Sequence, residues 1–412
     1  MRLRQENKSG IVFALGISQT IAWASSYYLP AVLAVPAAQE LAISPVRFFA
    51  AFSAALVLSA ILGPWCGARI DRFGGRGVLV GANIVFAAGL VLLGLCTGQV
   101  GMFAAWLLIG VGMGIGLYDS AFAALATIYG GEARTAITGI TLLAGFASTI
   151  GWPLSAGMEA HFGWRGACFG WAALHIFLAL PLNALLPKAI YLQPKTKEQV
   201  KEQAKEEIQE KTQERLKKKA DSATSNSEFW ELSILAFVFA ITCFSSTAMA
   251  VHLPRLLQET GASSVAAVAA GALMGPAQVM ARVFEFAFLS RVHPLISTRL
   301  AVLAHPLGAV ILVVIGAPAA AAFTFLHGAG NGMLTIAKGT LPLTLFGSVG
   351  YGLRQGLISF PARVLQAFAP LIFGFALELY GKNAIWLNIS LSLLAFAALL
   401  ALRIRPVRAS EK

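Results

Sequence analysis

Residues 67–76 read Gly-Ala-Arg-Ile-Asp-Arg-Phe-Gly-Gly-Arg, and this short charged stretch lies between two long apolar runs. The run before it covers roughly residues 46–68 and the run after it roughly residues 78–97. A helix that rises 1.5 Å per residue needs about 20 apolar residues to cross ~30 Å of hydrocarbon. The pattern therefore predicts two membrane-spanning helices joined by a short polar turn.

Runs of this kind recur along the whole chain of 412 residues. Twelve are predicted to span a membrane: residues 11–34, 46–68, 78–97, 101–128, 134–158, 165–187, 231–251, 264–289, 299–316, 319–345, 354–378 and 385–402. The composition agrees, because 57% of the residues are hydrophobic and 12% are charged, whereas a soluble domain carries about 25% charged residues. The ten-residue alternating segments of a membrane β-barrel are not visible. The predicted fold class is an all-α polytopic membrane protein with 12 transmembrane helices.

Basic residues predict the orientation, because they are enriched on the cytoplasmic side. With the N-terminus inside, only four Lys and Arg residues fall outside, namely Arg47, Arg165, Arg255 and Lys382. The net charge of +12 is thus explained by topology, and no nucleic-acid partner is needed. The first run is too long for the apolar region of a signal peptide. We expect both termini in the cytoplasm and a location in a cell membrane, with the short loops favouring a bacterial inner membrane.

The central segment, residues 188–230, is rich in both Lys and Glu and has only a thin apolar stripe. We interpret it as a charged, partly helical cytoplasmic linker between residues 1–187 and residues 231–412, each with six predicted spans. A repeat relates the two halves: glycines alternate at residues 110–114 and again at residues 328–332. Glycines at every second position allow neighbouring helices to approach closely. The halves are therefore predicted to be two pseudo-symmetric six-helix bundles.

The stretch from Gly67 to Arg76 closely resembles the G-x-x-x-D-R-x-G-x-R loop of the major facilitator superfamily, and the six-plus-six layout matches as well. The resemblance implies a transporter fold in which this loop latches the cytoplasmic side. It assigns gate roles to five residues: Gly67, Asp71, Arg72, Gly74 and Arg76. Proton-coupled drug exporters of the family carry an arginine early in span four, where this chain has Trp106, and their span-five motif is also altered here at residues 151–157.

Ionisable groups at bilayer depth are costly and are functional candidates by default. The predicted spans contain Asp119, Arg282, Glu285, Lys338 and Arg363. Asp119 and Lys338 fall at nearly equivalent levels of the two repeats, so we expect an ion pair or a substrate and proton site there, and Arg282 is expected to contact Glu285. Asp119 and Glu285 are the candidates for proton coupling. The excess of cations favours an anionic substrate.

Basic residues in spans eight and eleven also resemble the oxalate/formate antiporter and monocarboxylate-porter branch, where cations from these spans hold a carboxylate. That resemblance implies substrate contacts for Arg282 and Arg363, whose planar guanidinium groups match a carboxylate. Lys338 is a third cationic candidate. Polar and aromatic side chains complete the predicted pocket: Gln278, Gln366, Asn331, Gln19, Trp23, Tyr27, Tyr28 and Ser246.

The predicted function is a secondary active transporter for a small organic anion, coupled to protons or working by exchange. Two alternatives remain: a proton-driven exporter of hydrophobic or cationic compounds that uses Asp119, and a non-transporting sensor on the same scaffold. We expect no enzymatic activity, cofactor or metal, because no P-loop or metal-ligand spacing is present. The four cysteines show no paired spacing. The expected partners are the substrate, H⁺ and the lipid bilayer, and the chain is expected to act as a monomer.

Overall fold

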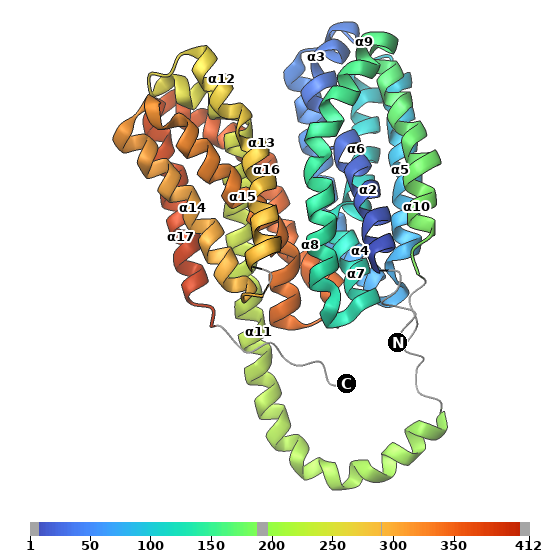
Figure 1. Cartoon of the computed structure of the whole chain (residues 1–412). Helices are drawn as coiled ribbons and strands as arrows, with labels where there is room; N and C mark the ends of the chain where they lie inside the picture. The colour runs from blue at the N-terminus through green and yellow to red at the C-terminus, as the bar shows by residue number, and fades with distance from the viewer. Residues whose placement is uncertain (1–7, 188–196, 290, 404–412) are drawn as a thin grey trace.

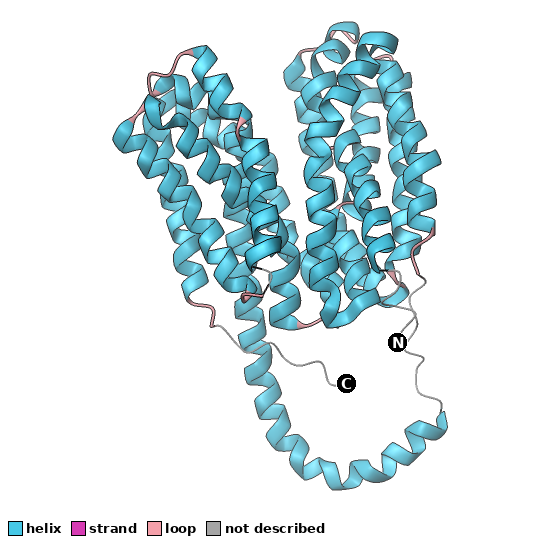
Figure 2. Cartoon of the chain, viewed as in Figure 1, coloured by secondary structure: helices cyan, strands magenta, loops and turns pink. Residues whose placement is uncertain are grey.

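The computed structural model describes residues 8–187, 197–289 and 291–403. These residues form helices joined by short loops, and none of them lies in a strand. Figure 2 shows this all-helical architecture in two groups of helices. The predicted linker falls partly outside the described residues, at 188–196. The remainder of the linker belongs to a long helix that begins at Lys197 and continues into the second group.

The first group, which we call the N-bundle, covers residues 8–187. Its helices are α2 (Lys8–Ser25), α3 (Pro30–Glu40), α4 (Pro45–Phe73), α5 (Gly75–Leu95), α6 (Gln99–Gly116), α7 (Tyr118–Tyr129), α8 (Ala133–Leu143), α9 (Ala147–Leu174) and α10 (Leu180–Ala184). A short 3-10 turn joins α8 to α9, and a π-helical turn, His175–Ala179, joins α9 to α10.

The second group, the C-bundle, covers residues 227–403. Its helices are α11 (Lys197–Glu259, from Ser227 onward), α12 (Ser264–Ala272), α13 (Met274–Phe284), α14 (Pro294–Ile315), α15 (Ala320–Phe346), α16 (Tyr351–Tyr380) and α17 (Ile385–Leu400). A π-helical turn, Glu285–Leu289, follows α13 directly.

The helices of the described residues make twelve crossings, six in each bundle. Eight helical stretches in this part of the chain are long and apolar enough to span a membrane. Two of them, Gln99–Ala184 and Tyr351–Leu400, are too long for one crossing, and the chain turns within them at Gly130, Gly163 and Gly381, each of which has a positive φ. Glycine adopts such a φ without steric cost. The 27 residues of α15 form the remaining crossing.

The first and the fourth of the crossings that we expected to be continuous are interrupted. The first is split between Ser25 and Pro30, and the fourth is split at Leu117, where the backbone is extended between α6 and α7. The break at Leu117 leaves Asp119 in the first turn of a new helix. A carboxylate in that position interacts favourably with the helix dipole.

In each bundle, the alternating glycines lie in close contact with two neighbouring helices. A Cβ atom at Gly110 would overlap Ala55 of α4, and one at Gly112 would overlap the Phe86 ring of α5. In the C-bundle, a Cβ at Gly328 would overlap α13, and one at Gly330 would overlap His305 of α14. The repeat predicted from the sequence is thus a repeat of close helix packing.

The two bundles meet at one end and diverge toward the other (Figure 1). We call the end where they meet the latch end; it holds the start of α2, the α4–α5 turn and the start of α16. Contacts between the bundles are made chiefly by α4 and α7 with α16, and by α8 with α13 and α15. Every residue of the candidate site is positioned by these helices or by those directly beside them.

Candidate functional site

One face of α16 carries the main polar contact between the bundles. Gln355, Ser359 and Arg363 follow one another at intervals of four and therefore lie on the same side of the helix. All three donate to the carboxylate of Asp119 in α7: Arg363 Nη2 at 2.7 Å and Nε at 3.2 Å, Ser359 Oγ at 3.0 Å and Gln355 Nε2 at 3.1 Å. Arg363 Nη1 also donates to Ser59 Oγ of α4 at 3.2 Å. The Asp119–Arg363 ion pair is largely buried and joins the two bundles.

The expected pairing of Asp119 with Lys338 is therefore wrong. Asp119 faces α16, and its two carboxylate oxygens are already occupied by donors from that helix. Lys338 lies on α15 and its Nζ donates to Cys243 Sγ of α11 at 2.7 Å, within the C-bundle. Equivalent levels in the two repeats did not bring these two side chains together, because Asp119 contacts α16 and Lys338 contacts α11.

The second buried arginine has a different environment. Arg282 of α13 is 5% exposed, and its guanidinium donates to four neutral acceptors at 3.3–3.5 Å. These are the carbonyl oxygens of Gly332 and Thr141 and the side chains of Gln278 and Thr335. All four distances exceed the usual range for N–H···O bonds. Within the described residues, no carboxylate lies within 4 Å of this guanidinium.

The expected contact between Arg282 and Glu285 is also wrong. Arg282 reaches across to the N-bundle, where a Cβ atom at Gly145, in the 3-10 turn that follows α8, would collide with its guanidinium. Glu285 begins the π-helical turn that follows α13, and Arg134 at the start of α8 donates to the carbonyl of Leu289, the last residue of that turn, at 3.4 Å. Glu285 is 3% exposed, and its Oε2 has no hydrogen-bond partner among the described groups. It is thus a buried carboxyl group that is only partly satisfied.

Aromatic side chains of the N-bundle form a continuous row beside these charges. Trp23 contacts Tyr27, Tyr28 and Tyr118, with ring centroids 5.4, 6.3 and 4.9 Å away. Tyr27 OH accepts a 2.8 Å hydrogen bond from Gln366 Nε2 of α16, so it also joins the bundles.

The remaining predicted pocket residues fall into two groups. Gln278, Asn331 and Ser246 lie on C-bundle helices: Gln278 contacts Arg282, and Asn331 is nearly buried with its amide nitrogen unpartnered among the described groups. Gln19, in contrast, is fully buried in the N-bundle and donates to the carbonyl of Gly116 at 2.7 Å. Because the break after Gly116 frees that carbonyl from its helix, the Gln19 amide N–H satisfies a backbone group, while its Oε1 has no partner among the described groups.

The latch end is closed by the loop identified in the sequence. Both oxygens of Asp71 accept from backbone N–H groups at the start of α16, Gly352 at 2.8 Å and Leu353 at 2.9 Å. A Cβ atom at Gly67 would overlap the carbonyl group of Gly352. Gly74 ends α4 with a φ of 82°.

The two arginines predicted as gate residues, Arg72 and Arg76, form no ion pair with an acid among the described residues. Arg72 lies over the Phe73 ring, and Arg76 is half-buried. Arg134 completes the latch end by donating to the Val292 carbonyl of the C-bundle at 2.8 Å.

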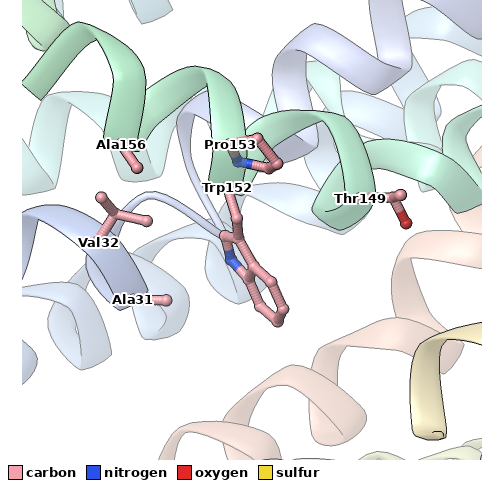
Figure 3. A pocket seen from close by; sticks show the side chains of 6 residues that line it. All are labelled: Ala31, Val32, Thr149, Trp152, Pro153 and Ala156. Carbon is pink, nitrogen blue, oxygen red and sulfur yellow. The ribbon is translucent and has the colours of Figure 1, made fainter. Parts of the chain in front are cut away.

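A cavity of about 580 Å³ opens at the end where the bundles diverge. Figure 3 shows its six lining side chains, which come from α3 and α9: Ala31, Val32, Thr149, Trp152, Pro153 and Ala156. The ring of Trp152 packs edge-to-face against Tyr28 at 6.0 Å, so the cavity connects to the aromatic row.

Several residues of the site and of the contact between the bundles were not predicted from the sequence. The sequence nevertheless contains signals for part of this set. Gly63 and Gly67 in α4, and Gly352 and Gly356 in α16, form two G-x-x-x-G patterns, which are typical of closely packed membrane helices. The structure places these two patterns against each other. Gln355 and Ser359 could have been inferred from their spacing to Arg363. Tyr118 and Trp152 carry no comparable signal.

No metal site is suggested within the described residues, which contain no group of three or more His, Cys, Asp and Glu side chains arranged to hold an ion.

Comparison with known proteins agrees with this architecture. Residues 15–346 match the family described as Major Facilitator Superfamily. The human organic anion transporter MFSD10 (TETRAN) has a similar structure, with a TM-score of 0.70 at 15% identity, covering 96% of this chain and 99% of that one. The proton:xylose symporter XylE is similar with a TM-score of 0.71 at 13% identity, covering 95% of each chain. No curated protein matches in sequence. At these identities the structural similarity establishes the fold alone.

Proposed function

The chain belongs to the major facilitator superfamily, and from that premise we propose that it is a secondary active transporter for a small organic anion. Transporters with this architecture expose a midplane site alternately to the two sides as one bundle rocks against the other. The Asp119–Arg363 pair, the Arg282 contacts and the latch all cross the boundary between the bundles. These contacts would therefore break and form again in each transport cycle.

The environment of Arg282 is the observation that supports an anionic substrate. A buried cation is costly unless it is paired and hydrogen-bonded. Arg282 has four long contacts to neutral oxygens and no carboxylate partner within the described residues. A substrate carboxylate could supply shorter, charge-assisted bonds in the planar geometry that guanidinium favours.

The other charged residues take different roles in this proposal. The charge of Arg363 is compensated by Asp119, so we assign this ion pair to the coupling of the two bundles. Arg282 is then the first candidate for substrate binding and Lys338 the second. Glu285 becomes the better candidate for proton coupling, because Asp119 is held by three donors. Replacement of Glu285 by Gln should then remove the dependence of transport on a proton gradient while leaving anion binding intact.

The proposed orientation places the latch end in the cytoplasm of a bacterial cell, with the protein in the inner membrane as a monomer. In that orientation the described conformation is closed to the cytoplasm and opens outward. The basic residues near the latch end, such as Arg69, Arg72 and Arg76, support this assignment.

The exporter alternative is less well supported. Its central residue would be Asp119, which is occupied by Arg363, Gln355 and Ser359. Trp106, at the level where drug exporters of the family carry an arginine, is fully buried and contacts Phe48 and Phe52. The apolar cavity is a feature that would suit a hydrophobic substrate.

The test is thermal unfolding of the purified protein with a panel of mono- and dicarboxylates, phosphate and lipophilic cations. A ligand at a hundredfold excess over its Kd stabilises the folded state by about 2.7 kcal/mol. We expect stabilisation by a carboxylate that is lost in Arg282→Gln but retained in Arg255→Gln, a matched control at an exposed position of α11. Stabilisation by cations alone, or by carboxylates equally in both variants, would contradict the proposal. Binding without flux in proteoliposomes would favour a sensor.

A further inference from the structure

The cavity at the diverging end of the bundles has an almost wholly apolar lining. Five of its six lining side chains are apolar, and Thr149 supplies the one hydroxyl group. Trp152 is 47% exposed, and Figure 3 shows its indole ring projecting from α9. A large, partly exposed aromatic surface beside a cavity is suited to an apolar or aromatic ligand group.

A row of ring contacts leads inward from this cavity. Trp152 contacts Tyr28, Tyr28 contacts Trp23 at 6.3 Å, and Trp23 contacts Tyr118 at 4.9 Å. We call these four residues the aromatic path. The path begins at the apolar cavity and ends one residue before Asp119, at the boundary with the C-bundle.

The unpaired cation lies near the cavity from which the path leads inward. A Cβ atom at Gly145 would collide with the guanidinium of Arg282, and Gly145 precedes the cavity-lining Thr149 by four residues, about one helical turn. The indole nitrogen of Trp23 is buried and has no hydrogen-bond partner among the described groups. An N–H donor in that state is available to an acceptor that enters the site, because leaving it unpaired is costly.

We propose that the transported anion is amphiphilic: an aromatic or similarly bulky apolar body that lies along the aromatic path, with a carboxylate that binds Arg282. This inference rests on the proposed function and adds the substrate class. A two-carbon acid can satisfy the cation but cannot also cover the rings between Tyr118 and the cavity. An aryl carboxylate covers both, and its ring can pack edge-to-face or offset against Trp23 and Trp152.

The probes that test this are 2-naphthoate, acetate and the uncharged 2-naphthamide, with binding measured by thermal stabilisation of the full-length protein. We expect 2-naphthoate to bind at least tenfold more tightly than acetate. Trp152→Ala should weaken the binding of 2-naphthoate about three- to tenfold, which corresponds to the loss of one aromatic contact, and should leave acetate binding unchanged. Trp23→Phe keeps a ring and removes the N–H donor, so it should weaken the binding of both acids. Trp386→Ala, at a similarly exposed position of α17, is the control and should change neither.

The outcomes separate this inference from the function on which it rests. Equal affinity for acetate and 2-naphthoate, both lost in Arg282→Gln, would overturn the aromatic substrate and leave the anion transporter standing. Binding of 2-naphthamide as tightly as 2-naphthoate, insensitive to Arg282→Gln, would overturn both. If Trp152→Ala and Trp386→Ala have the same effect on 2-naphthoate, the aromatic path is not part of the site.

Discussion

Two buried arginines cross the boundary between the bundles, and their surroundings differ in one respect. Arg363 has a carboxylate partner at 2.7 Å, supported by Ser59. Arg282 has four neutral acceptors, none closer than 3.3 Å. Both side chains are largely enclosed, so exposure does not distinguish them.

The difference indicates a division of labour. A compensated ion pair between bundles stabilises the conformation in which it forms, and removing one partner is costly because the other charge remains buried. An uncompensated cation contributes little to that conformation and is available to a ligand. The two arginines should therefore respond in opposite ways to neutralisation.

Neutralising Arg363 should have the largest effect. Arg363→Gln leaves the Asp119 charge without its cation, and breaking a buried pair costs about 3–5 kcal/mol. The bundles can relieve this cost by separating and hydrating Asp119. Spin labels at Phe73 and Val349, two exposed positions at the latch end, should report longer distances. The double variant Asp119→Asn with Arg363→Gln should recover most of the closed population, and a double variant as open as the single one would contradict the pairing argument.

Crowding the α4–α16 contact should have the next largest effect on the closed latch end. A Cβ atom at Gly67 would overlap the Gly352 backbone, which cannot move as a side chain can, and overpacking of this kind costs about 1–3 kcal/mol. Gly67→Ala should thus lengthen the same label distance. Gly77→Ala is the control, because a Cβ there meets nothing within 4 Å. Equal distances in the two variants would show that the glycine contact does not set the closure.

Removing the Gln366–Tyr27 bond should have a smaller effect. Both partners are neutral, and a hydrogen bond of this kind contributes about 1 kcal/mol net. Tyr27→Phe keeps the ring contacts and removes the hydroxyl that accepts from Gln366. The closed population should fall several-fold, well short of the Arg363→Gln effect. A shift as large as that of Arg363→Gln would mean that Tyr27, rather than the ion pair, couples the bundles at this level.

Neutralising Arg282 should have the smallest effect on conformation. Arg282→Gln removes a buried charge that no carboxylate among the described residues compensates, so the melting temperature without ligand should stay the same or rise. Anion stabilisation should nevertheless disappear. A loss of stability comparable to that of Arg363→Gln would show that Arg282 is structurally paired and would remove the contrast between the two sites.

Local patterns predicted much of this protein. The apolar runs predicted the crossings, and the alternating glycines predicted two similar bundles whose helices pack closely at those positions. The loop at residues 67–76 predicted the superfamily. What failed were pairings between distant side chains: Asp119 was expected to meet Lys338, and Arg282 to meet Glu285.

The sequence by itself therefore determined the membrane fold, the number of crossings and the set of buried charges, because each depends on the residues within one span and on the cost of placing them in hydrocarbon. Only the tertiary structure decided which charges compensate each other. Asp119 and Arg363 are 244 residues apart, and three cations were available to the same carboxylate. An ion pair depends on a separation of about 3–4 Å, and that separation is set by which face α16 turns toward α7 and by the break that starts α7 at Tyr118.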